Sequence, residues 1–569
     1  MKEENRFMAA AVLLPLLVKI FFVQEGGYKL TIGRFAALGV LAAAYHLFLY
    51  VRKVQWERRK TALLYSMMCL FVIGVMEGIC FLRQNGGIGE GMTACLGLLL
   101  AAIVLAGAFL FVKGEKGVSE KVIWAAVFAA FLIRIFYVVM TRSHLFQNDL
   151  AGFNAEGYGH LGYTYFLFTD GKLPDLNPME YYELYQPPLH YAVSAVYLRI
   201  FEFLGMLPKE QSEWGEALQI LPLAYSMMTM VFITKIGKRM KLSAQGRLAV
   251  VCFAGFLPYS IMLSGSLNND PLAVLLMVMC IYYTFKWYEK PDIKGILIMA
   301  LCIGLAMMTK ISTALIAPAM AVMMLYRAWI DRKQWMVYVK QFACFGLIAF
   351  PLGLWHSVYN FVKYEVPLGY AAFLGEDSAQ YIGQHDKWAR FFDFDRAFEF
   401  LAVRLDYIHD FADYNIPVTL IKFATFGESS YYDSSLLTNI LGTGIFWADA
   451  ALFVFMAAAL VFWCFRKDGR GIQKTFLLTG AAVSLYSYLK FCIKYTHVCT
   501  MNVRYIMGAF YIGCLVIGGA LTAIQEMTSK KGAAAGRAGA VGVKAVTVVS
   551  VVYGAAVITL LAGMEVLLP

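Results

Sequence analysis

Long apolar runs follow one another along the whole chain, separated by short polar or basic connections. Most are about 20 residues long, the length of helix that crosses a hydrocarbon core of roughly 30 Å. Backbone groups in lipid must be hydrogen-bonded within their own segment, so the runs predict helices. They cover residues 7–23, 35–51, 61–82, 93–113, 122–140, 216–235, 246–264, 270–288, 294–309, 312–330, 339–361, 446–465, 475–491, 503–524 and 543–566, with a weaker run at 187–206. We predict an all-α polytopic membrane protein with about 15 spans.

Two long polar segments, 141–215 and 362–445, interrupt this pattern. The first contains the stretch Arg142–His190, which is rich in acids, histidines and tyrosines and holds a Gln-Pro-Pro turn. A solvated loop between two helices would also be polar. The length and the aromatic content of this stretch favour a site for polar chemistry at the bilayer surface.

Basic residues gather in the short connections, for example at 52–60, 235–247 and 466–474. Cytoplasmic loops carry such an excess of Lys and Arg, so we expect the amino terminus inside and both long polar segments outside. In this topology the chain must cross the membrane an odd number of times between the first polar segment and residue 235. Two apolar runs, 187–206 and 216–235, lie in that interval, so one of them cannot cross. The run at 187–206 opens with two prolines and carries charged residues, so we expect it to lie along the outer face without crossing, which leaves the carboxyl terminus outside.

Composition agrees with a membrane protein, because 60% of the residues are hydrophobic and 15% are charged. The net charge of +11 comes from residues in the short connections, where it indicates topology and contact with anionic lipid heads, not nucleic acid. Most of the 11 cysteines lie within apolar runs and no metal-knuckle spacing occurs, so we predict no disulfide framework.

Three short turns on the expected outer face carry polar or charged residues: 268–270, 309–310 and 497–504. Charged residues at span ends are costly enough to suggest function. Each has a simpler explanation as well. Asp270 before Pro271 suits a helix start as the N-cap residue, and Lys310 could extend to the interface. Arg504 opens a span on the outer side, against the usual sign preference, which favours a functional role.

Most soluble-enzyme signatures are missing from the sequence: no phosphate-binding loop, dinucleotide glycine fingerprint or HExxH occurs. One Asp-x-Asp, at Asp393–Asp395, could hold a metal and a nucleotide sugar, but nucleotide sugars are scarce on the outer side. A carboxylate opposite cations suits transfer of a group from a phosphate to a hydroxyl: the carboxylate takes the hydroxyl proton and the cations stabilise the departing phosphate. A lipid-borne phosphate donor is then the natural substrate.

The order of several short motifs resembles the GT-C superfamily of polytopic glycosyltransferases that use polyprenyl-phosphate sugars. The similarity is greatest to bacterial family 39, the dolichyl-phosphate-mannose protein mannosyltransferase-like enzymes, and to aminoarabinose transferases. The motifs are Gln147–Asp149, Gly159–Tyr163, Gly171–Asp175, Tyr185–His190, Ser266–Pro271, Gly304–Lys310 and Asn502–Tyr505. The resemblance covers roughly residues 122 to 525 and leaves out the leading spans.

The resemblance implies roles for individual residues. Asp149 matches the first-loop aspartate proposed as catalytic base, and Asp270 matches a second acidic position that shapes the site. Gln186 stands where several relatives have lysine or histidine, so Lys310 and Arg504 become the candidates for the lipid phosphate. Further substrate-binding candidates are Asn269, His160, His190, Tyr505 and Glu428. Either histidine could instead be a hydrogen-bonded structural residue, and no clear ligand cluster supports a divalent metal or another cofactor.

We therefore expect a GT-C-like helical bundle with accessory helices at 1–121, a catalytic membrane module at 122–361 that includes the first outer loop 141–215, a second outer loop at 362–445, and carboxyl-terminal helices at 446–569. The expected activity is transfer of a sugar, with inversion, from a polyprenyl-phosphate donor to an acceptor hydroxyl on a glycan, lipid or protein at the outer face of the cytoplasmic membrane.

Two alternatives remain open. A glycan polymerase or ligase would use a lipid pyrophosphate and often an outer histidine–arginine pair, for which His497 and Arg504 qualify. A lipid or solute transporter would place charges within spans, where we find Arg134, Asp449 and Lys490.

Overall fold

The computed structural model describes residues 2–22, 117–141, 143, 159–181, 183–372, 374–404, 412–427, 436–529 and 533–565, with scattered residues between 39 and 102. Every regular element in these residues is a helix, apart from one isolated bridge between Tyr381 and His497. Within the described part of the chain, 9 helices are long and apolar enough to cross a membrane, or up to 10 if a bent pair counts as one span. The all-α polytopic class is therefore confirmed.

The amino-terminal half contains α1 (Lys2–Phe22), α5 (Glu120–Met140), α6 (Gly159–Asp170), α7 (Leu189–Phe203), α8 (Trp214–Leu218), α9 (Ile220–Arg239), α10 (Ala244–Phe256), α11 (Pro258–Met262) and α12 (Asp270–Glu289). The remainder contains α13 (Ile293–Thr309), α14 (Ala317–Ile330), α15 (Trp335–Tyr364), α16 (Ala389–Phe392), α18 (Ile416–Phe426), α19 (Leu436–Cys464), α20 (Gly471–Lys494), α21 (Met507–Thr528) and α22 (Ala533–Glu565). Short 3₁₀ turns join several of them, including η5 (Val498–Met501) and η6 (Val503–Ile506).

The boundaries differ from the expected ones at several points. The apolar run 246–264 is bent by 67° where Pro258 follows α10, because proline cannot donate the hydrogen bond that would continue the helix. Helices α19 and α22 begin about ten residues before the apolar runs that mark them, since polar residues at a span end are tolerated outside the hydrocarbon core. Helix α19 therefore starts about ten residues before the end of the second outer loop expected at 445.

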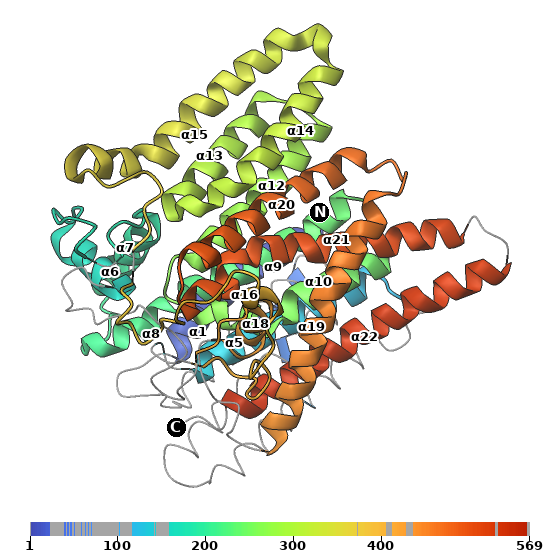
Figure 1. Cartoon of the computed structure of the whole chain (residues 1–569), viewed down its shortest axis with the longest axis horizontal. Helices are drawn as coiled ribbons and strands as arrows, with labels where there is room; N and C mark the ends of the chain where they lie inside the picture. Colours follow the sequence, from blue (N-terminus) through green and yellow to red (C-terminus); the bar gives the residue numbers. More distant parts are fainter. Residues whose placement is uncertain are drawn as a thin grey trace.

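The core of the bundle is formed by α9, α10, α12 and α21, which pack against one another and against α5 and α22 (Figure 1). Helices α13 and α15 pack together at one edge, beside α12 and α14. Helices α6 and α7 form a small separate group (Figure 1), with their own apolar cluster around Leu198 and Phe201.

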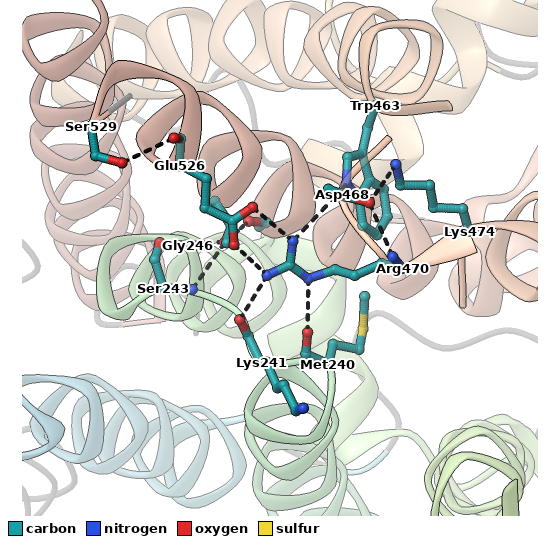
Figure 2. A network of polar contacts seen from close by, with 12 residues as sticks. Met240, Lys241, Ser243, Gly246, Trp463, Asp468, Arg470, Lys474, Glu526 and Ser529 are labelled. Carbon is teal, nitrogen blue, oxygen red and sulfur yellow. Dashed lines mark hydrogen bonds and ion pairs between the residues drawn. The ribbon is translucent and has the colours of Figure 1, made fainter. Parts of the chain in front are cut away.

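One face of the bundle gathers the basic connections. Arg470, at the start of α20, donates hydrogen bonds to Glu526 near the end of α21 and to the carbonyls of Met240 and Lys241 between α9 and α10 (Figure 2). Asp468 binds both Arg470 and Lys474 beside them. Burial opposes ionisation of this carboxyl, but hydrogen bonds from Lys474 and Trp463 lower its pKa below the usual value. These contacts hold the end of α9, the start of α20 and the end of α21 at one level.

The opposite face carries elements of the first polar segment. Glu216, just before α9, accepts hydrogen bonds from the backbone N–H and hydroxyl of Ser143, just after α5. The end of α5 and the start of α9 therefore lie on the same face, which agrees with a 187–206 segment that does not cross. Asp175 binds Lys363 and Tyr364 at the end of α15, at 2.5 Å and 2.7 Å, so α15 ends on this face as well.

Candidate functional site

A buried ion pair joins the ends of two neighbouring helices. Helix α12 starts at Asp270 and α13 ends at Thr309, and the two pack side by side. The Nζ of Lys310 lies 2.5 Å from Oδ1 of Asp270, with 13% and 5% of the two side chains exposed. Such a pair holds both ionised groups in place, because either one alone would be costly at this depth.

The geometry bears on the simpler explanation of Asp270 as the N-cap residue of its helix. The N-cap residue is Asn269, and its side chain makes no capping hydrogen bond. The backbone N–H of Asp270 instead donates to the side-chain oxygen of Asn268, 3.0 Å away. The Asp270 carboxylate faces Lys310, so helix capping does not explain why an acid occupies this position. The Lys310 ammonium group is bound to Asp270, so extension toward the interface does not explain why a lysine stands there.

The Gln-Pro-Pro turn of the first outer segment lies against this corner. Asn269 donates hydrogen bonds from Nδ2 to the Thr309 carbonyl at 3.0 Å and to the side-chain oxygen of Gln186 at 3.2 Å. Gln186 in turn donates to the hydroxyl of Tyr185. Residues that are far apart in the sequence thus form one polar wall, in which Gln186 binds protein groups.

Arg504 and Tyr505 bring the last predicted motif to the same place. Both lie in η6, whose N-cap Asn502 accepts a hydrogen bond from the Arg504 backbone N–H. Arg504 donates from Nη2 to the Tyr505 hydroxyl at 3.0 Å, and its guanidinium carbon is 5.0 Å from the ring centre. The Lys310 ammonium is 5.1 Å from that centre. Two cations therefore lie against one aromatic ring, and Asp270 lies within the electrostatic field of both.

Tyr185 extends the aromatic lining of the cluster. Burial raises the pKa of Tyr185 well above its usual value, and the nearby Glu183 adds to this while Arg504 opposes it. The phenol therefore stays protonated and can donate or accept a hydrogen bond. Its ring packs edge-on against Tyr370, which follows α15.

The two predicted histidines lie on α6 and α7, at the rim of this cluster. His190 donates from Nε2 to the Leu267 carbonyl at 2.9 Å, which leaves Nδ1 as a buried acceptor with no hydrogen-bond partner among the described residues. Burial lowers the pKa of His190 to about 4, so the ring is neutral at pH 7. His160 contacts the Tyr191 hydroxyl at 2.9 Å through Nδ1.

Glu183 is a site residue that sequence reasoning did not select. It is buried, its φ of 74° lies in the left-handed region, and Oε2 is 3.8 Å from Nδ1 of His160. A non-glycine residue there carries strain, which surrounding contacts must hold. The sequence shows an acid before the Gln-Pro-Pro turn, but nothing in it indicates burial.

Two predicted residues, Asp149 and Glu428, lie outside the described residues. The structure brings the other predicted site residues into one region: Gln186, Asn269, Asp270, Lys310, Arg504 and Tyr505 in direct contact, with His160 and His190 beside them. Among the described residues, no three His, Cys, Asp or Glu side chains gather in an arrangement that could hold a metal ion.

The Asp-x-Asp sequence has a structural role in the second outer segment. Asp393 accepts hydrogen bonds from the Tyr414 hydroxyl at 2.7 Å and from the Asp395 backbone N–H at 2.9 Å, and these bonds lower the pKa of its carboxyl. Asp395 is exposed. The Asp393 carboxylate and the Asp395 backbone N–H therefore stabilise a turn in the loop.

Comparisons with known proteins agree with the motifs. Residues 186–355 match the family model of dolichyl-phosphate-mannose-protein mannosyltransferases, which confirms the expected resemblance over that segment. A solved structure, ArnT from Cupriavidus metallidurans bound to undecaprenyl phosphate, aligns with 78% of this chain and 76% of its own at 14% identity and a TM-score of 0.42. No curated protein matches the sequence. The matched segment includes Gln186, Asp270 and Lys310 but not Arg504.

Proposed function

We propose that this chain is a membrane glycosyltransferase that transfers a sugar from a polyprenyl-phosphate donor to an acceptor hydroxyl on the outer face of the cytoplasmic membrane, with inversion. The observation that carries the proposal is the cluster in which Lys310 and Arg504 share the Tyr505 ring beside the buried carboxylate of Asp270. The match of residues 186–355 to a mannosyltransferase family supports the class of reaction.

The two cations bind and stabilise the phosphate of the donor. As the bond between the anomeric carbon and the phosphate oxygen breaks, negative charge grows on that oxygen, and cations already in place stabilise it. Asp270 holds the Lys310 ammonium group in position before the donor arrives, through the ion pair between the two side chains. Tyr505 orients both cations through its ring and its hydroxyl.

The acceptor hydroxyl attacks the opposite face of the anomeric carbon and loses its proton to a carboxylate. We assign this role to Asp149, from its match to the first-loop aspartate of the resembled family. The new glycosidic bond forms while the bond to phosphate breaks, so polyprenyl phosphate leaves and the anomeric centre is inverted. His190 offers its Nδ1 as an acceptor for a substrate hydroxyl.

Neither alternative function gains support from a described contact. His497 donates to the Gly375 carbonyl and pairs with Tyr381, so its ring holds the second outer segment to η5. Arg134 uses its three nitrogens on Ser226, Ser260 and the carbonyls of Ala130 and Gly255, and Asp449 accepts from Thr425 and Tyr553. These charges within spans belong to separate hydrogen-bonded sites.

The test is transfer by the purified protein from a panel of radiolabelled polyprenyl-phosphate and polyprenyl-pyrophosphate sugars to a mixed lipid and glycan acceptor extract. Asp149→Asn should lower turnover at least ~100-fold, because a positioned base contributes that much. Asp170→Asn is the matched control, since Asp170 is an exposed carboxylate at the end of α6 in the same loop. Equal turnover in Asp149→Asn and wild type would remove the base assignment. Transfer only from lipid pyrophosphates would favour the polymerase or ligase.

A further inference from the structure

An exposed aromatic ladder extends from the second outer segment onto α19. Phe394 stacks on Phe398 with ring centres 6.1 Å apart, and Phe398 stacks on Trp447 at 5.5 Å with the ring planes 24° apart. Phe394 and Phe398 are 49% and 41% exposed although both are large and apolar. Trp388 and Phe392 form a second exposed stacked pair in the same segment.

Trp447 belongs to the side of α19 that faces away from the bundle. Ile440, Trp447, Val454 and Val461 recur every seven residues, which is two helical turns, and each is more than half exposed. Helix α19 is a candidate membrane span and packs against α21 and α22 on its other side. An exposed apolar stripe on a span is the surface that touches lipid, so Trp447 is a lipid-facing residue.

The ladder fixes the depth of the loop against that surface. Trp447 is the second residue of the apolar run 446–465, and the residues before it in α19 include the polar Asn439 and Thr443. It therefore lies where the headgroup region meets the hydrocarbon, the level at which aromatic side chains are enriched. Because Phe398 stacks directly on Trp447, residues 394–398 lie at the same level and not above the membrane.

We propose that residues 394–398 insert into the outer leaflet and anchor the second outer segment to the bilayer interface. Aromatic burial holds the anchor, and charge contributes little, because the surrounding acids and bases nearly balance. These are Asp386, Asp393, Asp395 and Glu399 against Lys387, Arg390 and Arg396. The partner is therefore the interfacial zone of the lipid bilayer, whatever the charge of its headgroups.

The anchor connects mechanically to the element that carries Arg504. Asp393, next to the ladder, accepts from the Tyr414 hydroxyl through its carboxylate and from the side-chain amide of Asn415 through its carbonyl. Asn415 is the N-cap of α18, which packs against η6. Insertion of the ladder thus fixes the level of α18, and through it the level of η6, relative to the membrane. This inference does not depend on the proposed enzymatic activity.

The test is photo-crosslinking with p-benzoylphenylalanine, a phenylalanine analogue, placed at Phe394 or at Phe398 in separate variants. Each purified variant is reconstituted into nanodiscs of phosphatidylcholine or of phosphatidylglycerol and irradiated. Intact-protein mass spectrometry then measures the mass of any lipid adduct. Tyr486, an exposed residue within the span α20, is the lipid-facing control position. Asp377, an exposed residue in the part of the loop that pairs with η5, is the aqueous control position.

We expect both ladder positions to gain the mass of one lipid in either bilayer, with yields within about twofold of the Tyr486 position and at least ~10-fold above the Asp377 position, since benzophenone reacts with the acyl C–H bonds beside it. Absence of lipid adducts at 394 and 398, with adducts at 486, would overturn the insertion. Adducts confined to phosphatidylglycerol would overturn the aromatic basis of the anchor.

Discussion

The ammonium group of Lys310 lies 5.1 Å from the centre of the Tyr505 ring while it is bound to the carboxylate of Asp270. Lys310 ends α13 and Tyr505 precedes α21, so the contact joins two ends of the bundle that are nearly two hundred residues apart in the sequence. It also places the cation between an aromatic ring and an acid, so that both contacts orient the ammonium group before any substrate binds.

The first prediction concerns the ion pair. Asp270→Asn or Lys310→Met alone should lower the free energy of unfolding by about 3 kcal/mol, because each leaves a buried charge without its partner. The double variant should recover most of this loss, since no unpaired charge remains. Thermal unfolding in detergent measures stability, and transfer should stay lost in the double variant. Additive losses of stability in the double variant would mean that the pair is not coupled.

The second prediction separates the two functions of Tyr505. Tyr505→Phe removes the hydroxyl that binds Arg504 but keeps the ring. It should raise the KM for the donor by less than about tenfold, because the net free energy of one hydrogen bond corresponds to a factor of that size. Tyr505→Leu also removes the aromatic ring that both cations contact and should raise the KM by a further factor of about ten. Equal kinetics in the two variants would show that the ring contributes nothing to the cations.

The third prediction is a pH dependence of stability at His190. Burial lowers the pKa of this ring from 6.5 to about 4, while the hydrogen bond to Leu267 and the Asp270 carboxylate oppose the shift. The unfolded chain takes up a proton below pH 6.5 and the folded ring does not, so stability present above pH 6.5 is lost as the pH falls toward 4. The loss should reach about 3 kcal/mol.

His190→Gln is the control for this pH dependence, because glutamine can donate to the same carbonyl but does not titrate. Unfolding temperatures of both proteins between pH 7.5 and 4 measure the difference. Parallel curves would rule out His190 as the titrating group.

The fourth prediction concerns the Asp-x-Asp sequence. Asp395→Asn should leave transfer unchanged, because Asp395 is exposed and uses its backbone N–H in the turn. Asp393→Ala should loosen the attachment of Tyr414, detected as faster proteolysis of the second outer segment. If the two carboxylates held a metal with the donor, both substitutions would abolish transfer.

Much of the fold followed from the apolar runs. The run 270–288 predicts α12 almost to the residue, because a span must stay apolar over the hydrocarbon thickness and Pro271 favours the start of a helix. The early starts of α19 and α22 were not predictable from hydropathy, since helix outside the membrane core has no need to be apolar. Hydropathy does not register the bend at Pro258 either, although a proline inside an apolar run is itself a signal for such a bend.

The sequence by itself determined the membrane class of this protein, because a segment in lipid must satisfy its backbone hydrogen bonds internally and must be long enough to cross the core. It also supplied Asp270, Lys310 and Arg504 as polar exceptions at span ends, and Gln186 through the family resemblance. Only the tertiary structure decided that these exceptions meet, that Asp270 faces Lys310 instead of capping its helix, and that Glu183 is buried beside them. Hydrophobic periodicity places a residue along its own helix. Which helix ends adjoin depends on the packing of side chains between α12, α13 and α21, and that information is distributed over the whole chain.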